Sequence, residues 1–506
     1  MPRVRAPELP QDYPWLNCDR PLSLKSLRGR VVILDFWTYG CINCLHMLPT
    51  LKDLERTYTN ELTIIGVHSA KFDREKDVEN VRQAILRYDI EHPVIVDQDF
   101  QIWQQYTIKA WPTLVIIDPQ GYVVSSLAGE SDRASLSTLL DTILQEHRKK
   151  GTVNVDRLST ALEKQRQPLF TPLLFPGNVL ADAASSTLFI ADTGHHRIVR
   201  TSLSGDVQTI IGTGQAGLTD GTFPEVEFSS PQGMTFDPNQ HMLYVADTGN
   251  HVIRQVDLHR QTVTTIAGTG QQSDRLTPHH GDALKTPLNS PWGLVKVGHH
   301  LFIAMAGSHQ IWQLDLLTQI VGTYIGTGAE FRVDGGVAEA AFAQPSGLTT
   351  DEHRLYSADS ETSTIRAIQL QEQPVAQTVC GNGELFGFGD VDGVGEAAKL
   401  QHCLGITYMA PNTLWVADTY NHKIKQVDLL SNRCQTIFGT GVAGFQDGSR
   451  ETAQFYEPSG LSQVGNSLYV VDTNNHAIRA IDLKTSHVET LSFSGLCAPD
   501  VCFPTF

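Results

Sequence analysis

One segment recurs six times in the C-terminal two thirds of this 506-residue chain. The copies are ADTGHHRI at 191–198, ADTGNHVI at 246–253, AMAGSHQI at 304–311, ADSETSTI at 358–365, ADTYNHKI at 417–424 and VDTNNHAI at 471–478. Their starts lie 55, 58, 54, 59 and 54 residues apart, and self-similarity at a nearly fixed period indicates a repeat architecture. Because each unit carries four short strand patterns, six units predict a six-bladed β-propeller.

The repeat resembles the NHL repeat from about Leu169 to Phe493. We therefore expect an NHL propeller over residues 169–494 and a short C-terminal tail over 495–506. Two copies depart from the pattern, because Met305 replaces the motif aspartate and Ser363 replaces the motif histidine. The sixth unit contains four strand patterns of its own, so the ring is expected to close without an exchanged strand.

The recurring acids and histidines invite a metal hypothesis, which the ring geometry opposes. Equivalent positions in different blades lie far apart, so the motif side chains cannot converge on one ion. We expect them to bond local backbone instead.

Turn chemistry is likewise expected for the loop acids Asp220, Asp334, Asp390, Asp392 and Asp447, which recur beside glycines. No ligand cluster is evident at the axial ends of the inner strands, which makes a propeller hydrolase the weakest hypothesis.

A second motif, FWTYGCINCL at 36–45, places two cysteines two residues apart between an apolar strand and a helical pattern. The N-terminus of a helix favours the thiolate form of the first cysteine, so Cys41 is predicted to be the attacking sulfur. A zinc site would need two further ligands, and His46 is the nearest candidate. The pattern favours redox chemistry, with His46 as a solvated helix residue.

The segment around this motif has the alternation of an α/β domain. Strand patterns cover 31–37, 62–68, 94–97, 113–118 and 122–127, and helical patterns cover 41–58, 75–88 and 134–147. We expect one domain over residues 1–147 and a linker with some helical character over 148–168.

This domain resembles the thioredoxin superfamily, in particular its TlpA-like branch. Cys41 and Cys44 match the redox pair, and Pro112 matches the cis-proline opposite it. Asp35, six residues before Cys41, matches the buried acid, and Pro49 matches the proline inside the helix. The resemblance therefore implies a thioredoxin-like fold.

The same resemblance implies a mechanism. Cys41 attacks a partner disulfide, Cys44 resolves the mixed disulfide, and Asp35 exchanges the proton of Cys44. The substrate side is expected at Tyr39, Trp111, Pro112 and Thr113. Structural roles for Asp35 and Trp111 stay open as alternatives, and His68 is expected to be a satisfied polar group. Ile42-Asn43 stands where thioredoxin has Gly-Pro, which leaves the direction of electron flow open.

The other cysteines suggest no disulfide framework. Cys380 is expected in the core because other copies carry apolar residues there, and Cys403 and Cys434 are expected to be equally inert. A second exchangeable disulfide between Cys497 and Cys502 is conceivable, but we expect two unreacted thiols. Cys18 has no assignable partner.

Composition limits the partners. The excess of 55 acidic over 38 basic side chains gives a formal charge of -17, which opposes nucleic-acid binding. No apolar window approaches the roughly 18 residues of a membrane helix, and no apolar core of signal-peptide length begins the chain, so a cytoplasmic location is expected. Sulfur exchange needs no small-molecule cofactor, and we predict none.

The order of thioredoxin-like domain, linker and NHL propeller resembles a family that combines these parts. Our leading hypothesis is a thiol-disulfide oxidoreductase that acts on protein disulfides, exchanges electrons with a protein dithiol and uses the propeller as a docking platform. The alternative is a non-catalytic interaction scaffold with a redox-sensitive cysteine pair.

Overall fold

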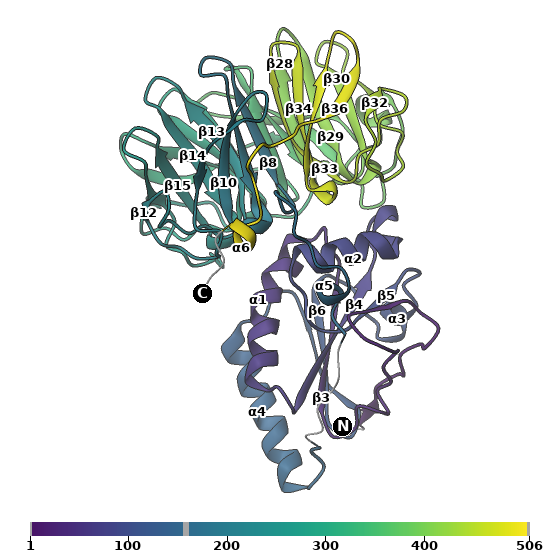
Figure 1. Ribbon diagram of the computed structural model, residues 1–506. Coiled ribbons are helices and arrows are strands. Elements are labelled where there is room, and N and C mark those ends of the chain that lie inside the picture. Colours follow the sequence, from purple (N-terminus) through teal and green to yellow (C-terminus); the bar gives the residue numbers. More distant parts are fainter. Residues whose placement is uncertain (1–2, 155–160, 503–506) are drawn as a thin grey trace. The chain divides into compact units, whose positions relative to one another are not determined.

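A computed structural model describes residues 3–154 and 161–502 of the chain. The chain forms two compact units, Met1–Leu169 and Phe170–Phe506 (Figure 1). Residues 155–160, inside the segment expected to be a linker, lie outside the described part. The helix α5 (Glu163–Arg166) follows them and belongs to the first unit.

The first unit is built on a seven-stranded mixed sheet with the order β1-β7-β6-β3-β4-β5-β2. Its strands are β1 (Val4–Arg5), β2 (Trp15–Leu16), β3 (Val31–Trp37), β4 (Leu62–Ser69), β5 (Val94–Asp97), β6 (Thr113–Ile117) and β7 (Tyr122–Ala128). Its longer helices are α1 (Ile42–Thr57), α2 (Val78–Arg87), α3 (Gln101–Gln105) and α4 (Arg133–Lys149). This is the thioredoxin-like α/β fold that the sequence predicted.

The central strand β3 is buried on both faces, and its side chains alternate between two cores. Val31 and Ile33 pack with apolar residues of α1 and α4. Val32, Leu34 and Phe36 pack on the other face with residues from β4, β5 and α3. The alternation places Asp35 on the same face as Val31 and Ile33, under α1.

Two local details differ from the sequence prediction. The helix expected over 75–88 is a 3₁₀ turn, η1 (Asp73–Lys76), followed by α2, which begins after Asp77. Asp77 ends the turn because its side chain accepts a hydrogen bond from Glu79 N and caps the new helix. The short strands β1 and β2 and the helix α3 carry too few residues for a periodic pattern and were not predicted.

The second unit is a six-bladed β-propeller of antiparallel sheets. The first three blades are β8 (Asn178–Asp182), β9 (Thr187–Asp192), β10 (Arg197–Ser202) and β11 (Val207–Ile211); β12 (Gly221–Thr222), β13 (Pro231–Asp237), β14 (Met242–Asp247), β15 (Val252–Asp257) and β16 (Thr262–Ala267); and β17 (His280–Asp282), β18 (Pro291–Val297), β19 (His300–Met305), β20 (Gln310–Asp315) and β21 (Ile320–Ile325).

The last three blades are β22 (Gly335–Gly336), β23 (Pro345–Thr350), β24 (Arg354–Asp359), β25 (Thr364–Gln369) and β26 (Val375–Cys380); β27 (Gly393–Val394), β28 (Gly405–Met409), β29 (Thr413–Asp418), β30 (Lys423–Asp428) and β31 (Arg433–Phe438); and β32 (Gly448–Ser449), β33 (Pro458–Val464), β34 (Ser467–Asp472), β35 (Ala477–Asp482) and β36 (His487–Thr490).

Five blades have a fifth, two- or three-residue strand that the repeat did not predict. It lies in the crossover that leaves the outermost strand of one blade, and it pairs with the outermost strand of the next, as β12 does with β16. The tail after β36 makes the corresponding crossover to the first blade, where Ser494 bridges Asp206. Among the described residues no strand is exchanged to close the ring, because the first and sixth blades each contain four main strands from their own repeat, in agreement with the sequence prediction.

The alternating strand directions give each propeller face its own set of loops. The crossovers and the turns after the second strand lie on one side, which we call the crossover face. The hairpin turns after the first and third strands lie on the opposite side, which we call the hairpin face.

The motif histidines connect neighbouring blades. Each imidazole Nδ1 accepts a hydrogen bond of 3.0–3.1 Å from a backbone N–H at the start of the next blade; the pairs are His196 with Ser230, His251 with Ser290, His309 with Gln344, His422 with Glu457 and His476 with Phe175. In the fourth blade Ser363 Oγ accepts the equivalent bond from His402 N at 3.0 Å. The sequence analysis expected these side chains to bond local backbone. The histidines and Ser363 bond the backbone of the neighbouring repeat instead.

Each motif aspartate bonds backbone within its own blade and pairs with a buried cation that the sequence analysis missed. Asp247 Oδ1 accepts from Ser229 N, and its Oδ2 lies 2.9 Å from Arg254 Nη1. Asp359 with Arg366, Asp472 with Arg479 and Asp418 with Lys425 are equivalent pairs, and in the first blade Asp192 pairs instead with Arg197, five residues later at the start of β10.

The loop acids supply a second carboxylate to these cations. Asp220 Oδ1 lies 2.9 Å from Arg254 Nη2 and also accepts from Thr265 Oγ1. Asp334, Asp447 and the pair Asp390 and Asp392 contact Arg366, Arg479 and Lys425 in the same way. The expectation of simple turn chemistry at these acids was therefore wrong, because the cation that orders them lies in another strand.

The third blade lacks the ion pair altogether. Met305 takes the place of the aspartate, and Trp312, seven residues later, takes the place of the cation; both side chains are buried. Their burial shows that an apolar pair can fill the space of the ion pair.

Candidate redox site

Cys41 lies at the junction of β3 and α1. It is the N-cap residue of the helix, and its Sγ accepts a hydrogen bond from Cys44 N at 3.3 Å. Both cysteines are free thiols; Cys41 is partly exposed, whereas Cys44 is buried one helical turn behind it. The positive end of the helix dipole of α1 therefore lies at Cys41. The pair has one accessible sulfur and one shielded sulfur.

Asp35 lies beneath this pair in the core of the domain. Its side chain is 1% exposed, and neither carboxylate oxygen has a hydrogen-bond partner among the described residues. Burial raises the pKa of Asp35 to about 7, against the opposing effect of His92. Burial, together with its neighbour Cys41, also raises the pKa of Cys44 well above its usual range, and the charge of Asp35 acts in the same direction. The carboxyl of Asp35 therefore gains and loses its proton near neutral pH.

The loop before Cys41 is held by a carboxylate that sequence reasoning missed. Gly40 N donates to Glu75 Oε1 at 3.1 Å, and Lys71 N and Phe72 N donate to Glu75 Oε2. Glu75 is fully buried in η1. In the sequence it resembled an ordinary acid in the first turn of a helix, and no local signal connects it with a glycine 35 residues away.

Aromatic rings support the same loop from inside. Tyr39 is 2% exposed and stacks on His68, which also meets Trp37 edge-on. Burial lowers the pKa of His68 to about 3, so the ring is neutral. Neither imidazole nitrogen has a hydrogen-bond partner among the described residues, so His68 is not the satisfied polar group expected from sequence. The buried Tyr39 side chain offers no surface to a substrate.

The predicted substrate side comes from the start of β6. The pairing of Thr113 with Phe36 brings this strand beside the end of β3, and the Trp111–Pro112 peptide bond is cis. Thr113 is buried and donates to Ala110 O. Trp111 remains partly exposed.

Trp111 belongs to a small aromatic cluster. Its ring lies 4.4 Å from Trp103 and 6.0 Å from Phe100, and its indole N–H donates to Ser69 O. Of the four residues expected on the substrate side, Trp111 therefore has the partly exposed aromatic surface.

His46 is not the solvated residue that the helical pattern suggested. Its side chain is 7% exposed, and its Nδ1 lies 2.8 Å from Glu130 Oε1. Glu130 follows Gly129, whose N–H donates to Pro112 O. Within the described residues, Cys41 and Cys44 share no metal-binding group with a third ligand.

The remaining cysteines are separate from this site in sequence. Cys380, Cys403 and Cys434 are fully buried free thiols, and Cys18 is a buried free thiol whose pKa burial raises to about 11. Cys497 is disulfide-bonded, which corrects the expectation of an unreacted thiol. The side chain of Cys502 lies outside the described part of the chain.

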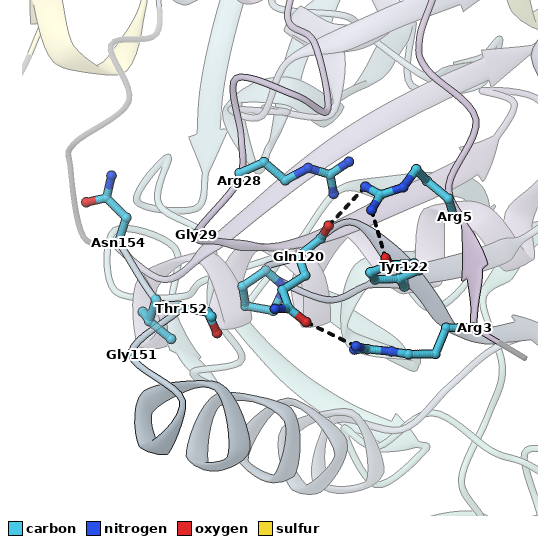
Figure 2. Close-up of a pocket in the computed structure, with 11 residues that line it drawn as sticks. Arg3, Arg5, Arg28, Gly29, Gln120, Tyr122, Gly151, Thr152 and Asn154 are labelled. Carbon is cyan, nitrogen blue, oxygen red and sulfur yellow. Dashed lines mark hydrogen bonds between the residues drawn. The ribbon is translucent and has the colours of Figure 1, made fainter.

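The first unit also has an open pocket of about 780 Å³, shown in Figure 2. Arg3, Arg5 and Arg28 line it, together with Gln120 and Tyr122 but no acidic residue. Because β6 begins directly after Pro112 and leads into the turn before Tyr122, this pocket lies at the opposite end of the strand from the cysteines. It is therefore not part of the redox site.

Within the described residues, no helix is both long enough and apolar enough to cross a lipid bilayer.

Comparison with known proteins agrees with both parts of the chain. A thioredoxin-like family model matches residues 29–123. NHL repeat-containing protein 2 of Bos taurus is 44% identical over 517 residues, which cover 95% of this chain and 70% of the relative. Protein SUPPRESSOR OF QUENCHING 1, chloroplastic, of Arabidopsis thaliana is 42% identical over 97% of this chain and 48% of its own length.

A more distant relative matches the first unit alone: thiol-disulfide oxidoreductase ResA of Bacillus cereus is 29% identical over 124 residues, which cover 24% of this chain and 69% of the relative. The similarity over 95% of this chain and 70% of the relative, the thioredoxin-like fold and the six-bladed propeller together show that the chain belongs to the NHL repeat-containing protein 2 family.

Proposed function

We propose that the protein is a thiol-disulfide oxidoreductase that acts on disulfides of other proteins. The observation that carries the proposal is the arrangement of a partly exposed Cys41 thiol at a helix N-terminus, a buried Cys44 behind it and the buried carboxyl of Asp35 below. A purely structural cysteine pair needs neither the accessible sulfur nor the unpartnered acid. The likeness of the first unit to a protein named as a thiol-disulfide oxidoreductase supports the same function.

The reaction transfers two electrons from the cysteine pair to the partner. The Cys41 thiolate attacks one sulfur of the partner disulfide, a mixed disulfide forms, and the other partner sulfur leaves as a thiolate that takes up a proton. Cys44 then gives its proton to Asp35 and attacks Cys41 Sγ, which breaks the bond to the partner, and the second partner sulfur leaves as a thiolate that takes up this proton. The partner leaves as a dithiol, the cysteine pair becomes a disulfide, and a protein dithiol reduces it again. Run in reverse, the same steps oxidise a partner.

The propeller serves as the docking platform in this proposal. Its crossover face exposes apolar side chains from five successive crossovers, namely Leu218, Leu276, Phe331, Phe386 and Phe445, the phenylalanines being 56–67% exposed. A large exposed apolar patch is typical of a protein-binding surface, and in this proposal the side chains at equivalent loops of neighbouring blades form one such surface. Binding there raises the effective concentration of the partner disulfide near Cys41.

Turnover of a protein disulfide by the full chain tests the proposal. With insulin as substrate and dithiothreitol as electron source, we expect Cys41→Ser to abolish turnover and Cys44→Ser to accumulate a mixed disulfide, because the attacking sulfur remains and the resolving one is gone. Retained turnover in Cys41→Ser, or no mixed disulfide in a folded Cys44→Ser protein, would contradict catalysis by this pair.

The second candidate is a scaffold whose cysteine pair responds to redox conditions. The exposed crossover face favours it, since that surface can bind proteins without any chemistry. A scaffold would show no turnover in the insulin experiment. Its partner affinity would instead change when Cys41 and Cys44 are oxidised.

A further inference from the structure

Two histidines and an aspartate meet on the hairpin face of the third blade. His299 lies in the turn between β18 and β19, His300 opens β19, and Asp315 ends β20. One ligand atom of each side chain lies within 4.8 Å of the other two. No other group of this kind is found among the described residues.

The sheet register explains why the three side chains meet. His300 and Asp315 are paired across two antiparallel strands, so their Cβ atoms project side by side. The backbone of His299 is tied to the same corner, because Leu316 N donates to His299 O at 3.0 Å. The two imidazole rings lie 4.0 Å apart. Main-chain bonds therefore bring all three residues together.

The carboxylate is positioned but not neutralised. Asp315 Oδ1 accepts hydrogen bonds from Leu317 N at 2.8 Å and Thr318 N at 3.2 Å, which fix the plane of the group. No described lysine or arginine forms an ion pair with Asp315. The carboxylate thus keeps its negative charge for another cation.

We propose that His299, His300 and Asp315 form a binding site for a divalent transition metal ion, with zinc as the best-matched one. Two imidazoles and one carboxylate are ligands that zinc and its neighbours prefer, whereas calcium and magnesium prefer oxygen ligands alone. Ligand atoms of one zinc ion lie about 3.3 Å apart, given metal–ligand distances of about 2.1 Å. The ligand atoms of this site lie within 4.8 Å of one another, and rotation of the exposed His299 side chain would bring its imidazole nitrogen to the distance that one zinc ion requires.

The site faces solvent, and three protein ligands leave at least one coordination position open. Water, or a side chain of a partner, completes the shell. The net charge of -17 favours cation binding over the whole surface. This site is independent of the proposed redox function, because its residues belong to the propeller alone.

The second blade provides a natural comparison. His241 takes the place of His299, Met242 the place of His300 and Asp257 the place of Asp315, since Met242 pairs with Asp257. Asp257 Oδ2 lies 3.0 Å from Arg260 Nη1, so this carboxylate is already neutralised. This corner also holds two histidines, because the rings of His241 and His259 lie 4.3 Å apart, but among the described residues it does not bring three ligand atoms within 4.8 Å of one another, and its carboxylate is already paired.

Calorimetric titration of the full chain with zinc chloride tests the site. All proteins carry Cys41→Ser and Cys44→Ser, which keep zinc off the thiols. We expect one site with a dissociation constant on the order of micromolar, weakened tenfold or more by His300→Ala and by Asp315→Asn. His241→Ala should leave binding unchanged. Unaltered binding in a folded His300→Ala protein, or no binding at millimolar zinc, would overturn the proposal.

A chemical probe gives the same answer without substitution at the site. Saturating zinc should slow the modification of His299 and His300 by diethyl pyrocarbonate at least fivefold, measured by mass spectrometry. His353 is exposed in the corresponding turn of the fourth blade, where Arg354 replaces the second histidine. Its modification should not change, and equal rates at His299 with and without zinc would refute the assignment.

Discussion

Asp35 is held in the folded protein with a pKa of about 7, well above the 3.8 of a free aspartate. Below pH 4 the carboxyl is protonated in both the folded and the unfolded chain, and its burial costs nothing extra. Between about pH 4 and pH 7 the unfolded chain has lost this proton while the folded chain keeps it, so the free energy of unfolding falls by roughly 4 kcal/mol in total. The destabilisation by the buried acid therefore begins near pH 4 and is complete above pH 7.

Asp35→Asn removes this cost, so we expect the variant to be more stable than the natural protein at pH 8 by up to about 4 kcal/mol. The difference should vanish near pH 4. Urea unfolding at the two pH values measures it, with the exposed Asp12→Asn as control. At pH 8 the variant should also resolve the mixed disulfide at least tenfold more slowly. Equal stability at both pH values would show that Asp35 is not the titrating group.

Glu75 acts on Cys41 through the Gly40 amide and is a positioning residue. Glu75→Gln keeps the size of the side chain but replaces one acceptor oxygen by a donor, which cannot accept from the backbone N–H groups. We expect the alkylation rate of Cys41 by iodoacetamide to change at least threefold, while the helical content stays constant. Glu79→Gln, on the exposed start of α2, is the matched control. Identical rates in all three proteins would leave Glu75 a purely structural role.

These two acids show how far a sequence can predict a site. Asp35 was found because it lies in the same strand as the motif, at a fixed offset from Cys41. Glu75 reaches the motif only through the tertiary fold, and Tyr39 was assigned to the surface because nothing in the sequence shows that His68 lies below it. Residues in the strand of the motif, and residues such as Pro112 that the family resemblance supplied, were predicted, whereas Glu75, which only the tertiary fold brings to the motif, was not.

The blades show the same limit at the level of elements. The strands were predicted from a period that recurs six times, so each copy supports the others. The cations of the ion pairs lie in the following strand, seven residues after Asp247, Asp359, Asp418 and Asp472. These arginines and the lysine lie between apolar residues of the strand. In the sequence they were therefore indistinguishable from charged residues on an exposed strand face.

The third blade suggests an exchange experiment on one of these pairs. Asp247→Ala leaves the buried Arg254 with Asp220 as its remaining carboxylate partner among the described residues, and we expect a loss of about 3 kcal/mol in the free energy of unfolding. The double change Asp247→Met with Arg254→Trp copies the third blade and should recover at least half of that loss. Denaturant unfolding of the wild type, both single variants and the double variant gives the coupling. Additive effects would mean that the two positions do not act as a unit.

At the scale of the whole molecule, the two faces of the propeller differ. Phe331 and Phe386 are each 67% exposed on the crossover face, whereas Leu317 and Leu430 are 75% and 81% exposed in hairpin turns. If partners dock on the crossover face, Phe331→Ser with Phe386→Ser should raise KM for a protein disulfide several-fold and leave kcat unchanged. Leu317→Ser with Leu430→Ser is the matched control. Turnover of a small disulfide should not change in either variant, and a KM effect confined to the control would assign docking to the hairpin face.

The fifth strands have a consequence for the behaviour of the protein in concentrated solution. An outermost strand with unpaired backbone groups is a template for edge-to-edge association between molecules. Here each crossover covers part of the next blade's outer edge, and the segment around Ser494 does this for the first blade. The segment around Ser494 therefore hinders edge-to-edge association of the first blade with other molecules. We expect a protein without this segment to aggregate more readily, because the outer strand of its first blade would be uncovered.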